Sequence, residues 1–282
     1  MTPGAIRSVI PFGAFVAIAF TVLSGCANIS SDPSVSTSSA LPAGARAALA
    51  PSGTLRAAIN FGNPILANRD AATGEARGVS VDLARELAKR LGVPIELVLY
   101  TSAGKVVEGI MSGAWDIAFY AIDPVRATDT NFSAPYVLIE GAYLVPRDSD
   151  IKRNEDVDRN GVRVVVGRGS AYDLYLTREL KKAKLVKAPT SPDVTDVMVA
   201  EKIEVAAGVK QQLQADAKRL SGLRLLDGRF MVINQAMAMP KGRPAGAGYL
   251  VAFVEEMKSS GFIADALKRH GIDGAVVAPA AR

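Results

Sequence analysis

Residues 116–126 read Asp-Ile-Ala-Phe-Tyr-Ala-Ile-Asp-Pro-Val-Arg, and residues 131–136 read Asn-Phe-Ser-Ala-Pro-Tyr. The apolar run that opens the first segment predicts a buried strand. A helix at about residues 104–112 and a short turn precede it. The same order returns later, with a helix predicted at residues 194–200 and a strand at 203–207, and an acidic residue opens each strand. Two interpretations stay open: two unrelated units, or two lobes built on one plan.

The flanking segments predict alternating strands and helices. Residues 55–60 and 95–100 are β-rich runs, and the segment from Val79 to Leu91 between them carries an apolar residue at every fourth position. This β-α-β order predicts a right-handed parallel crossover. The chain is expected to close with a strand at residues 230–239, helices at 249–257 and 262–270, and a frayed tail at 275–282.

A strand at residues 161–166 leads into a helix through Gly167-Arg-Gly-Ser170. The first backbone N–H groups of such a helix point at the loop, where they favour an anion. Ser170 could equally be an ordinary helix N-cap. The dinucleotide fingerprint lacks its further glycine because Tyr172 stands in that place, which argues against a nucleotide cofactor.

The start of the chain is typical of a secreted lipoprotein. Arg7 precedes the uncharged run 9–22, which at about 1.5 Å per residue is too short for a hydrocarbon core of about 30 Å. Residues 1–25 are therefore predicted to be a signal peptide. The segment Leu23-Ser-Gly-Cys26 resembles the bacterial lipobox, which makes Cys26 the expected lipidation site. The Ser/Pro-rich part of residues 26–50 predicts a flexible tether to a membrane.

Composition argues against several classes of protein. The formal net charge is +5 at pH 7 and is spread along the chain, which argues against a nucleic-acid partner. One cysteine and one histidine allow no intramolecular disulfide and no metal cluster, so we expect neither a metal nor another cofactor. We expect a monomer whose stability comes from its apolar core.

Residues 116–136 resemble the central signature of bacterial extracellular solute-binding proteins of family three, the periplasmic receptors of amino-acid ABC importers. Three flanking stretches are similar to other motifs of that family: Gly78-Val-Ser-Val-Asp-Leu83, residues 161–170 and residues 255–271. The resemblance spans about residues 53–272. It implies an α/β, bilobed, type II periplasmic-binding-protein fold, in which two α/β lobes joined by a two-segment hinge close on a ligand.

The resemblance also implies where the chain crosses between the lobes, namely near Leu144–Arg147 and Ile233–Ala238. It places residues 51–145 and 235–274 in lobe one, residues 146–234 in lobe two and residues 275–282 in a C-terminal tail.

Arg126 matches the family arginine that pairs with a ligand carboxylate, and its planar fork of donors suits two oxygens. The other residues that the resemblance places at the ligand are Asn60, Phe61 and Asn63 after the first strand, Phe119, Tyr120 and Ala121 on the strand before Arg126, and Ser170, Ala171, Tyr172, Val209 and Lys210 from the second lobe.

Val209 departs from the family pattern, because the acidic residue that receives an α-ammonium should fall there. An apolar side chain cannot balance a desolvated ammonium. Either Asp123, Glu140 or another carboxylate replaces the acid, or the ligand is not a standard α-amino acid. Lys210 would favour a second anionic group, which leaves dicarboxylates and keto acids open.

Three functions follow. The first, which we expect, is a periplasmic receptor without catalytic residues, anchored through Cys26, that hands an amino acid or related small carboxylate to an ABC permease in the inner membrane. The second is an enzyme on the same scaffold, similar to cyclohexadienyl dehydratases. It would need a general acid or base, and the lone His270 lies in the terminal helix. The third is a ligand-sensing accessory lipoprotein.

Overall fold

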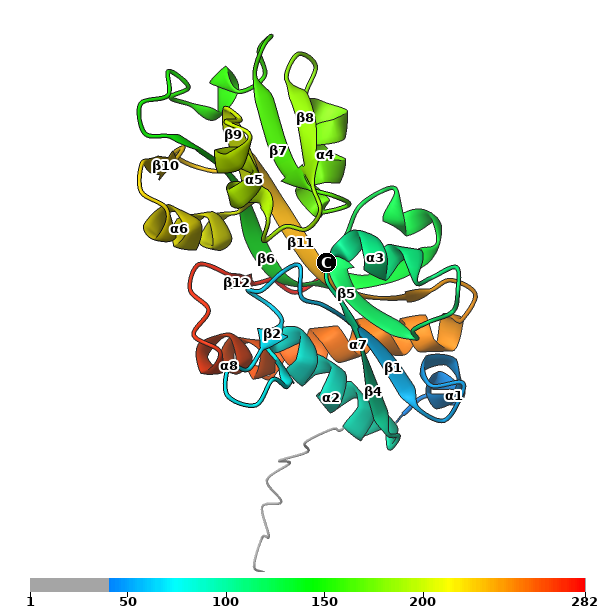
Figure 1. Cartoon of the computed structure of the whole chain (residues 1–282). Helices are drawn as coiled ribbons and strands as arrows, with labels where there is room; N and C mark the ends of the chain where they lie inside the picture. The colour runs from blue at the N-terminus through cyan, green and yellow to red at the C-terminus, as the bar shows by residue number, and fades with distance from the viewer. Residues whose placement is uncertain (1–40, 282) are drawn as a thin grey trace, which may run out of the picture. The chain divides into compact units, whose positions relative to one another are not determined.

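The computed structural model describes residues 41–281, which form a mixed α/β unit (Figure 1). The predicted signal peptide, Cys26 and the tether up to residue 40 lie outside the described residues. Within residues 41–281, no helix combines the length and the apolar character that crossing a membrane requires.

One ten-stranded sheet runs through this unit. Its order is β4 (Ile95–Tyr100), β1 (Leu55–Asn60), β5 (Ile117–Ala121), β11 (Met231–Pro240), β6 (Thr130–Pro146), β9 (Val205–Val209), β7 (Arg163–Gly167) and β8 (Lys184–Ala188), while β10 (Leu223–Leu225) and β12 (Val276–Val277) pair with β6. A separate two-stranded sheet joins β2 (Asn68–Arg69) to β3 (Ala76–Arg77).

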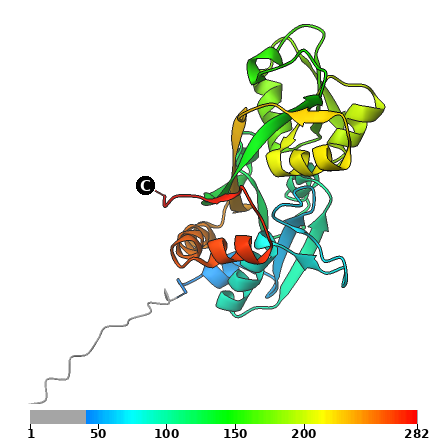
Figure 2. The same ribbon diagram turned by 90° about the vertical axis from the view of Figure 1, so that its left-hand side faces the viewer.

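The sheet contains two parallel groups. Strand β1 pairs in parallel with β4 and β5, and β7 pairs in parallel with β8 and β9. The antiparallel strands β11 and β6 connect the two groups (Figures 1 and 2). We call the β1 group with its helices lobe one and the β7 group with its helices lobe two.

Helices accompany each group. Lobe one has α1 (Ala45–Leu49), α2 (Val79–Leu91), α3 (Ala103–Glu108), α7 (Pro244–Ser259) and α8 (Phe262–Arg269), lobe two has α4 (Ala171–Glu179), α5 (Val194–Ala200) and α6 (Lys210–Arg219), and two short 3-10 turns are η1 (Arg126–Thr128) and η2 (Asn154–Asp156). Helix α2 shows why the sequence pattern works: Val79, Leu83 and Leu87 are fully buried, and Gly92 ends the helix in the left-handed conformation.

The two lobes follow the same plan. Each lobe has a central strand, β1 or β7. The strand after α2 or α4 is outermost (β4 or β8), and the strand after α3 or α5 is next to the connecting strands (β5 or β9). An ion pair repeats as well. The backbone N–H and guanidinium of Arg56 on β1 bond Asp116, which precedes β5, and those of Arg163 on β7 bond Glu204, which precedes β9. This arrangement favours the interpretation of two lobes on one plan.

Strand β6 carries the chain from lobe one to lobe two. Its residues pair with β11 over most of their length, and from Gly141 to Leu144 they also pair with β9. The limits of the lobes remain a prediction, but β6 takes its lobe-two partner before the Leu144–Arg147 segment expected for the first crossover. Because β6 runs through both groups as one strand, its sequence shows no turn or break that would mark where it enters lobe two.

Two terminal segments are more ordered than the sequence predicts. The Ser/Pro-rich segment predicted to be flexible ended at about Gly44, and the last part of residues 26–50 forms α1, on which Ala45 and Leu49 are fully buried and pack beside α7. The expected frayed tail contributes β12, which pairs with Val137 and Leu138 of β6, and the Ala278 N–H donates to a β6 carbonyl. In both places a short segment gains order from a tertiary partner, which local composition does not reveal.

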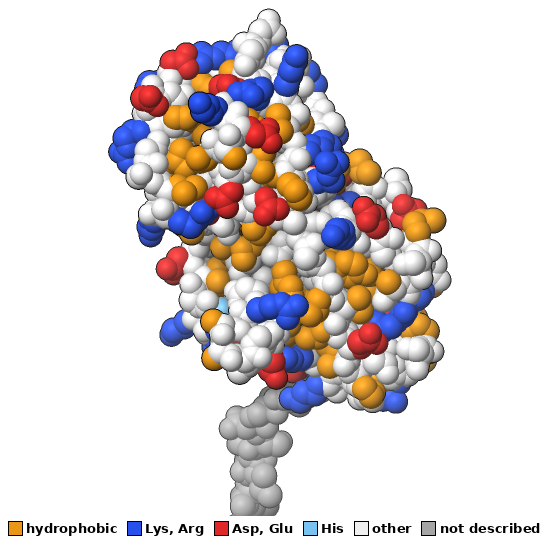
Figure 3. Space-filling model, in the orientation of Figure 1, with side chains coloured by type: hydrophobic (Ala, Val, Ile, Leu, Met, Phe, Trp, Pro, Cys, Tyr) orange, Lys and Arg blue, Asp and Glu red, His pale blue; other side chains and the backbone are white. Residues whose placement is uncertain are grey.

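Basic and acidic side chains are interspersed over the face of the molecule shown in Figure 3. On this face the lysines and arginines do not gather into a continuous stripe.

Candidate ligand-binding site

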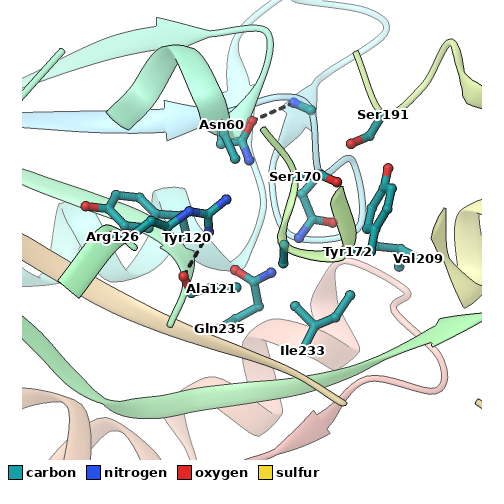
Figure 4. Close-up of a pocket in the computed structure, with 14 residues that line it drawn as sticks. Asn60, Tyr120, Ala121, Arg126, Ser170, Tyr172, Ser191, Val209, Ile233 and Gln235 are labelled. Carbon is teal, nitrogen blue, oxygen red and sulfur yellow. Dashed lines mark hydrogen bonds between the residues drawn. The ribbon is translucent and has the colours of Figure 1, made fainter. Parts of the chain in front are cut away.

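A pocket with about 350 Å³ of empty space, its open mouth included, lies where the two lobes meet (Figure 4). It is lined by Asn60, Gly62, Asn63, Ala103, Tyr120, Ala121, Arg126, Ser170, Ala171, Tyr172, Ser191, Val209, Ile233 and Gln235. These residues come from the carboxyl ends of β1, β5 and β9 and the turns that follow β1 and β5, from the starts of α3 and α4, from the loop between β8 and α5, and from β11. The carboxyl ends of parallel strands are where open α/β sheets bind ligands.

Arg126 is the charged centre of the pocket. Arg126 is almost completely buried, with 3% of the residue exposed. Nη1 donates to the Ala121 carbonyl at 2.8 Å, Nη2 donates to the Gly169 carbonyl at 2.8 Å, and Nε has no partner. Burial lowers the pKa of Arg126 to about 10, so the guanidinium stays charged at neutral pH. A buried cation whose direct partners are carbonyls is suited to receiving an anion.

The turn after β5 places this guanidinium. The Oδ1 atom of Asp123 accepts a hydrogen bond from the Val125 N–H, and the Asp123 carbonyl accepts one from the Ala127 N–H. This tight turn folds Arg126 back over the end of β5, where the guanidinium lies 5.2 Å from the centre of the Tyr120 ring. Burial raises the pKa of Tyr120 to about 12, so its phenol remains protonated.

Lobe two contributes the start of α4. The Ser170 hydroxyl accepts a hydrogen bond from the Asp173 N–H at 3.0 Å, so Ser170 is the N-cap of the helix. The N–H groups of Ala171 and Tyr172 lie in the first turn, where no carbonyl of the helix can reach them. In Figure 4, Tyr172 lies with Ser191 and Val209 on the side of the pocket opposite Arg126. Lobe two thus presents neutral polar groups toward the guanidinium.

The lobes touch beside the pocket. Gly169 has φ +69°, and a Cβ atom there would lie 2.8 Å from the Cα of Gly104 in lobe one. Arg178 on α4 forms an ion pair with Asp123 at 2.9 Å, and Asp123 is 4% exposed. Together with the bond from Arg126 to Gly169, these contacts bring the lobes together around the pocket.

Nine of the twelve predicted ligand-binding residues line this single pocket. They are Asn60, Asn63, Tyr120, Ala121, Arg126, Ser170, Ala171, Tyr172 and Val209. Their role as ligand contacts remains a prediction.

The structure places the other three predicted residues elsewhere. Phe119 faces the core and packs edge-on against Tyr136, with ring centres 6.2 Å apart, because neighbouring residues on β5 point to opposite faces of the sheet. The ring of Phe61 lies under the guanidinium of Arg69. Lys210 is held by Glu140 at 2.7 Å.

Five lining residues were not foreseen: Gly62, Ala103, Ser191, Ile233 and Gln235. Ile233 and Gln235 are two positions apart on β11, so their side chains share one face of the strand. Because both lie inside the expected crossover, this spacing could have predicted that they line the pocket. Ser191 comes from the loop between β8 and α5. Its position depends on how β8 pairs with β7, which the sequence does not specify.

Arg126 is the one formally charged side chain among the lining residues. Asp123 and Glu140, the carboxylates considered as replacements for an acid at position 209, do not line the pocket. Among residues 41–281, no group of three or more His, Cys, Asp or Glu side chains is placed to hold a metal ion.

One comparison identifies a family, and solved structures share the fold. The model of "Bacterial extracellular solute-binding proteins, family 3" matches residues 56–272. A solute receptor for L-cysteine from Neisseria gonorrhoeae is similar in structure, with a TM-score of 0.71 and 24% identity over 82% of this chain and 94% of that chain. A suggested binding component of an ABC transporter from Wolinella succinogenes, complexed with lysine, gives a TM-score of 0.66 and 25% identity over 77% of this chain and 95% of that chain.

A curated relative adds an enzyme to the comparison. Cyclohexadienyl dehydratase from Pseudomonas aeruginosa is 28% identical over 137 residues, which are 47% of this chain and 50% of the enzyme. The match therefore spans about half the length of this enzyme.

Proposed function

The chain belongs to the bacterial extracellular solute-binding proteins of family 3, and from this premise we propose that it is the receptor of an ABC importer for an amino acid or related small carboxylate. The family and its bilobed, type II fold indicate solute binding outside the cytoplasm, in the periplasm. The observation that carries the proposal is the buried guanidinium of Arg126 in the pocket between the lobes, with a free Nε and no carboxylate partner.

Binding would proceed by closure of the lobes over the ligand. A carboxylate can take up the free Nε–H of Arg126 and the first-turn N–H groups of α4, which come from different lobes. A ligand that bonds both lobes stabilises the closed arrangement, and an importer can distinguish that arrangement from the open one. No residue of the pocket needs to react for this function.

The test is a thermal unfolding scan of the purified protein with a panel of amino acids, hydroxy acids, keto acids and dicarboxylates. A ligand at about a hundred times its Kd should stabilise the native state by roughly 2.7 kcal/mol. We expect Arg126→Ala to abolish the shift, because each charge-assisted hydrogen bond contributes about 1.5–3 kcal/mol. If the wild type responds to no carboxylate, the receptor proposal fails.

The control for this test is Arg178→Ala, which breaks a contact between the lobes outside the pocket. It should weaken binding only modestly. An equal loss in both variants would mean that Arg126 acts by holding the lobes together rather than by contacting the ligand.

We also propose that Cys26 carries a lipid and that the protein works at the membrane beside its permease, as a monomer. The sequence around Cys26 supports the lipid anchor. Cells expressing the protein and supplied with labelled fatty acid should yield a labelled protein, and Cys26→Ser should remain unlabelled. Equal labelling of the two proteins would contradict the anchor.

A second candidate function, a dehydratase, is favoured by the similarity to cyclohexadienyl dehydratase. Such chemistry needs a general acid or base at the substrate. Among the described residues that line the pocket, the ionisable groups are Arg126, Tyr120 and Tyr172, and burial raises the pKa of both phenols. Incubation with a carboxylated cyclohexadiene while following the absorbance of an aromatic product tests this function. Catalytic turnover would replace the receptor proposal.

A further inference from the structure

The charges around the pocket are distributed unevenly. The guanidinium of Arg126 lines it, and no carboxylate among the described residues does. A ligand in this pocket therefore meets one full positive charge and no negative one. Whatever binds should carry an anionic group and should not carry a cationic one.

The carboxylates nearest in sequence to lining residues are already paired. Asp123 bonds Arg178 and the Val125 N–H. Asp173 accepts from the Gly169 N–H at 2.8 Å and pairs with Lys187 at 3.2 Å. Asp193, two positions after Ser191, accepts from the Thr190 N–H at 3.0 Å and from the Thr190 hydroxyl at 2.6 Å. Asp123 and Asp173 thus each have a cation and a backbone donor, and Asp193 is bonded within its own turn.

Glu140 is occupied in the same way. One oxygen bonds Lys210 at 2.7 Å and the other bonds Arg229 at 2.8 Å. This pairing has a second effect, because it also holds Lys210 away from the pocket. Arg126 remains the single cation, so a second carboxylate on the ligand would have no counterion.

The uncharged polar groups indicate what the rest of the ligand should offer. Asn60 Oδ1 accepts from the Gly62 N–H, whereas Asn63 Oδ1 is buried and has no partner. A buried acceptor without a donor is unfavourable, and a ligand hydroxyl or amide N–H can supply the donor without adding charge. Alanine, valine and isoleucine side chains form the apolar part of the lining.

We propose that the pocket selects a small monocarboxylate that carries a neutral hydrogen-bond donor, such as a 2-hydroxy acid, over the corresponding zwitterionic amino acid. This inference rests on the proposed receptor function and specifies its ligand class. An α-ammonium here would be desolvated beside a guanidinium with no counterion. A 2-oxo acid lacks the donor for Asn63, and a dicarboxylate adds an unpaired charge.

The first test is calorimetric titration of the wild-type protein with ligands that share one carbon skeleton: L-lactate, L-alanine and pyruvate, then the same three forms of leucine, with succinate as the dicarboxylate. We expect each hydroxy acid to bind at least tenfold more tightly than its amino acid. Amino acids that bind equally well or better overturn the inference while leaving the receptor function intact. Failure of every carboxylate overturns both, so the two failures are distinguishable.

Val209 offers a reciprocal test. It lines the pocket and is the N-cap of α6, without a side-chain cap bond. Aspartate and asparagine are both good N-cap residues, so Val209→Asp and Val209→Asn should both fold and differ mainly in charge. Thermal unfolding of each variant verifies the fold.

We expect Val209→Asp to bind the amino acid at least tenfold more tightly than Val209→Asn does, and the hydroxy acid more weakly. The added carboxylate would balance the ammonium of a zwitterion, whereas the hydroxy acid carries only an anionic group for it to repel. Equal affinities of the two variants for the amino acid would show that the missing anion does not set selectivity, and would overturn the inference.

Discussion

The two lobes share one scaffold but differ at the ends of matching strands. In lobe one, β5 leads through a tight turn to the buried cation Arg126. In lobe two, the corresponding strand β9 ends at Val209 and continues directly into α6. The shared strand order thus determines where the pocket forms, because it brings carboxyl ends of strands together from both lobes. The few residues after each strand determine what the pocket can bind.

The lobes also differ in how deeply the repeated ion pair is buried. The side chain of Asp116 is 0% exposed and contacts Arg56 and Arg243, whereas that of Glu204 is 37% exposed and contacts Arg163. The same contact on the same scaffold therefore stands in two different dielectric environments. Its energetic contribution should differ accordingly.

The largest expected effect comes from breaking this pair in lobe one. Asp116→Ala removes the acceptor of two guanidinium groups and of the Arg56 N–H, and should lower the free energy of unfolding by about 3 kcal/mol. Glu204→Ala should cost less than about 1 kcal/mol, because its pair is exposed to solvent. Urea unfolding of the two variants measures the difference. Equal losses would show that burial does not distinguish the two lobes.

The second-largest expected effect comes from a substitution at the contact between the lobes. Gly169→Ala forces a left-handed alanine, which costs roughly 1–2 kcal/mol, and its Cβ would meet Gly104 of lobe one. Gly161→Ala is the matched control, since Gly161 also has positive φ but open space around it. Both should lose similar stability, but only Gly169→Ala should weaken ligand binding as well. The same ligand affinity in both variants would mean that the lobes need not touch for binding.

Removing the Arg178 side chain should have a smaller effect on the contact between the lobes. Its ion pair with Asp123 joins α4 to the turn after β5, but the Arg178 side chain is 38% exposed. We expect Arg178→Ala to weaken ligand binding by about 1 kcal/mol, or roughly fivefold in Kd. Arg219→Ala is the control, since Arg219 pairs with Asp196 and Asp216 inside lobe two. A calorimetric titration should show unchanged affinity for the control, and a matching loss there would contradict a closure effect.

Much of the fold, and the charged residue of the pocket, could be predicted from the sequence. The period-four pattern from Val79 to Leu91 predicted α2, and the apolar run after Asp116 predicted β5, because local periodicity records which face is buried. The family resemblance selected Arg126, which the structure places in the pocket. The fold and the charged centre could therefore be predicted before any coordinates.

The remaining features depend on contacts between distant segments. Phe119 and Tyr120 are both aromatic residues on one buried strand, and the sequence does not show that only Tyr120 faces the pocket. Lys210 stands next to a lining residue, but its ion pair with Glu140 joins residues that are seventy positions apart. Strand β12 forms because β6 offers it a partner. Such outcomes follow from register and tertiary pairing, which composition and periodicity do not encode.

The smallest predicted effect concerns Glu140, the acid that holds Lys210 beside the strand end of lobe two. Hydrogen bonds from Lys210 and then Arg229 lower the pKa of Glu140 from its ordinary value of 4.5. Because the folded-state pKa is lowered, the stabilisation is present above pH of about 4.5 and is lost as the pH falls through the folded-state value. Wild type should unfold at a higher temperature than Glu140→Gln near pH 6–7, with a difference that shrinks below about pH 4.5. A difference that is independent of pH would contradict the pairing of Glu140 with Lys210 and Arg229.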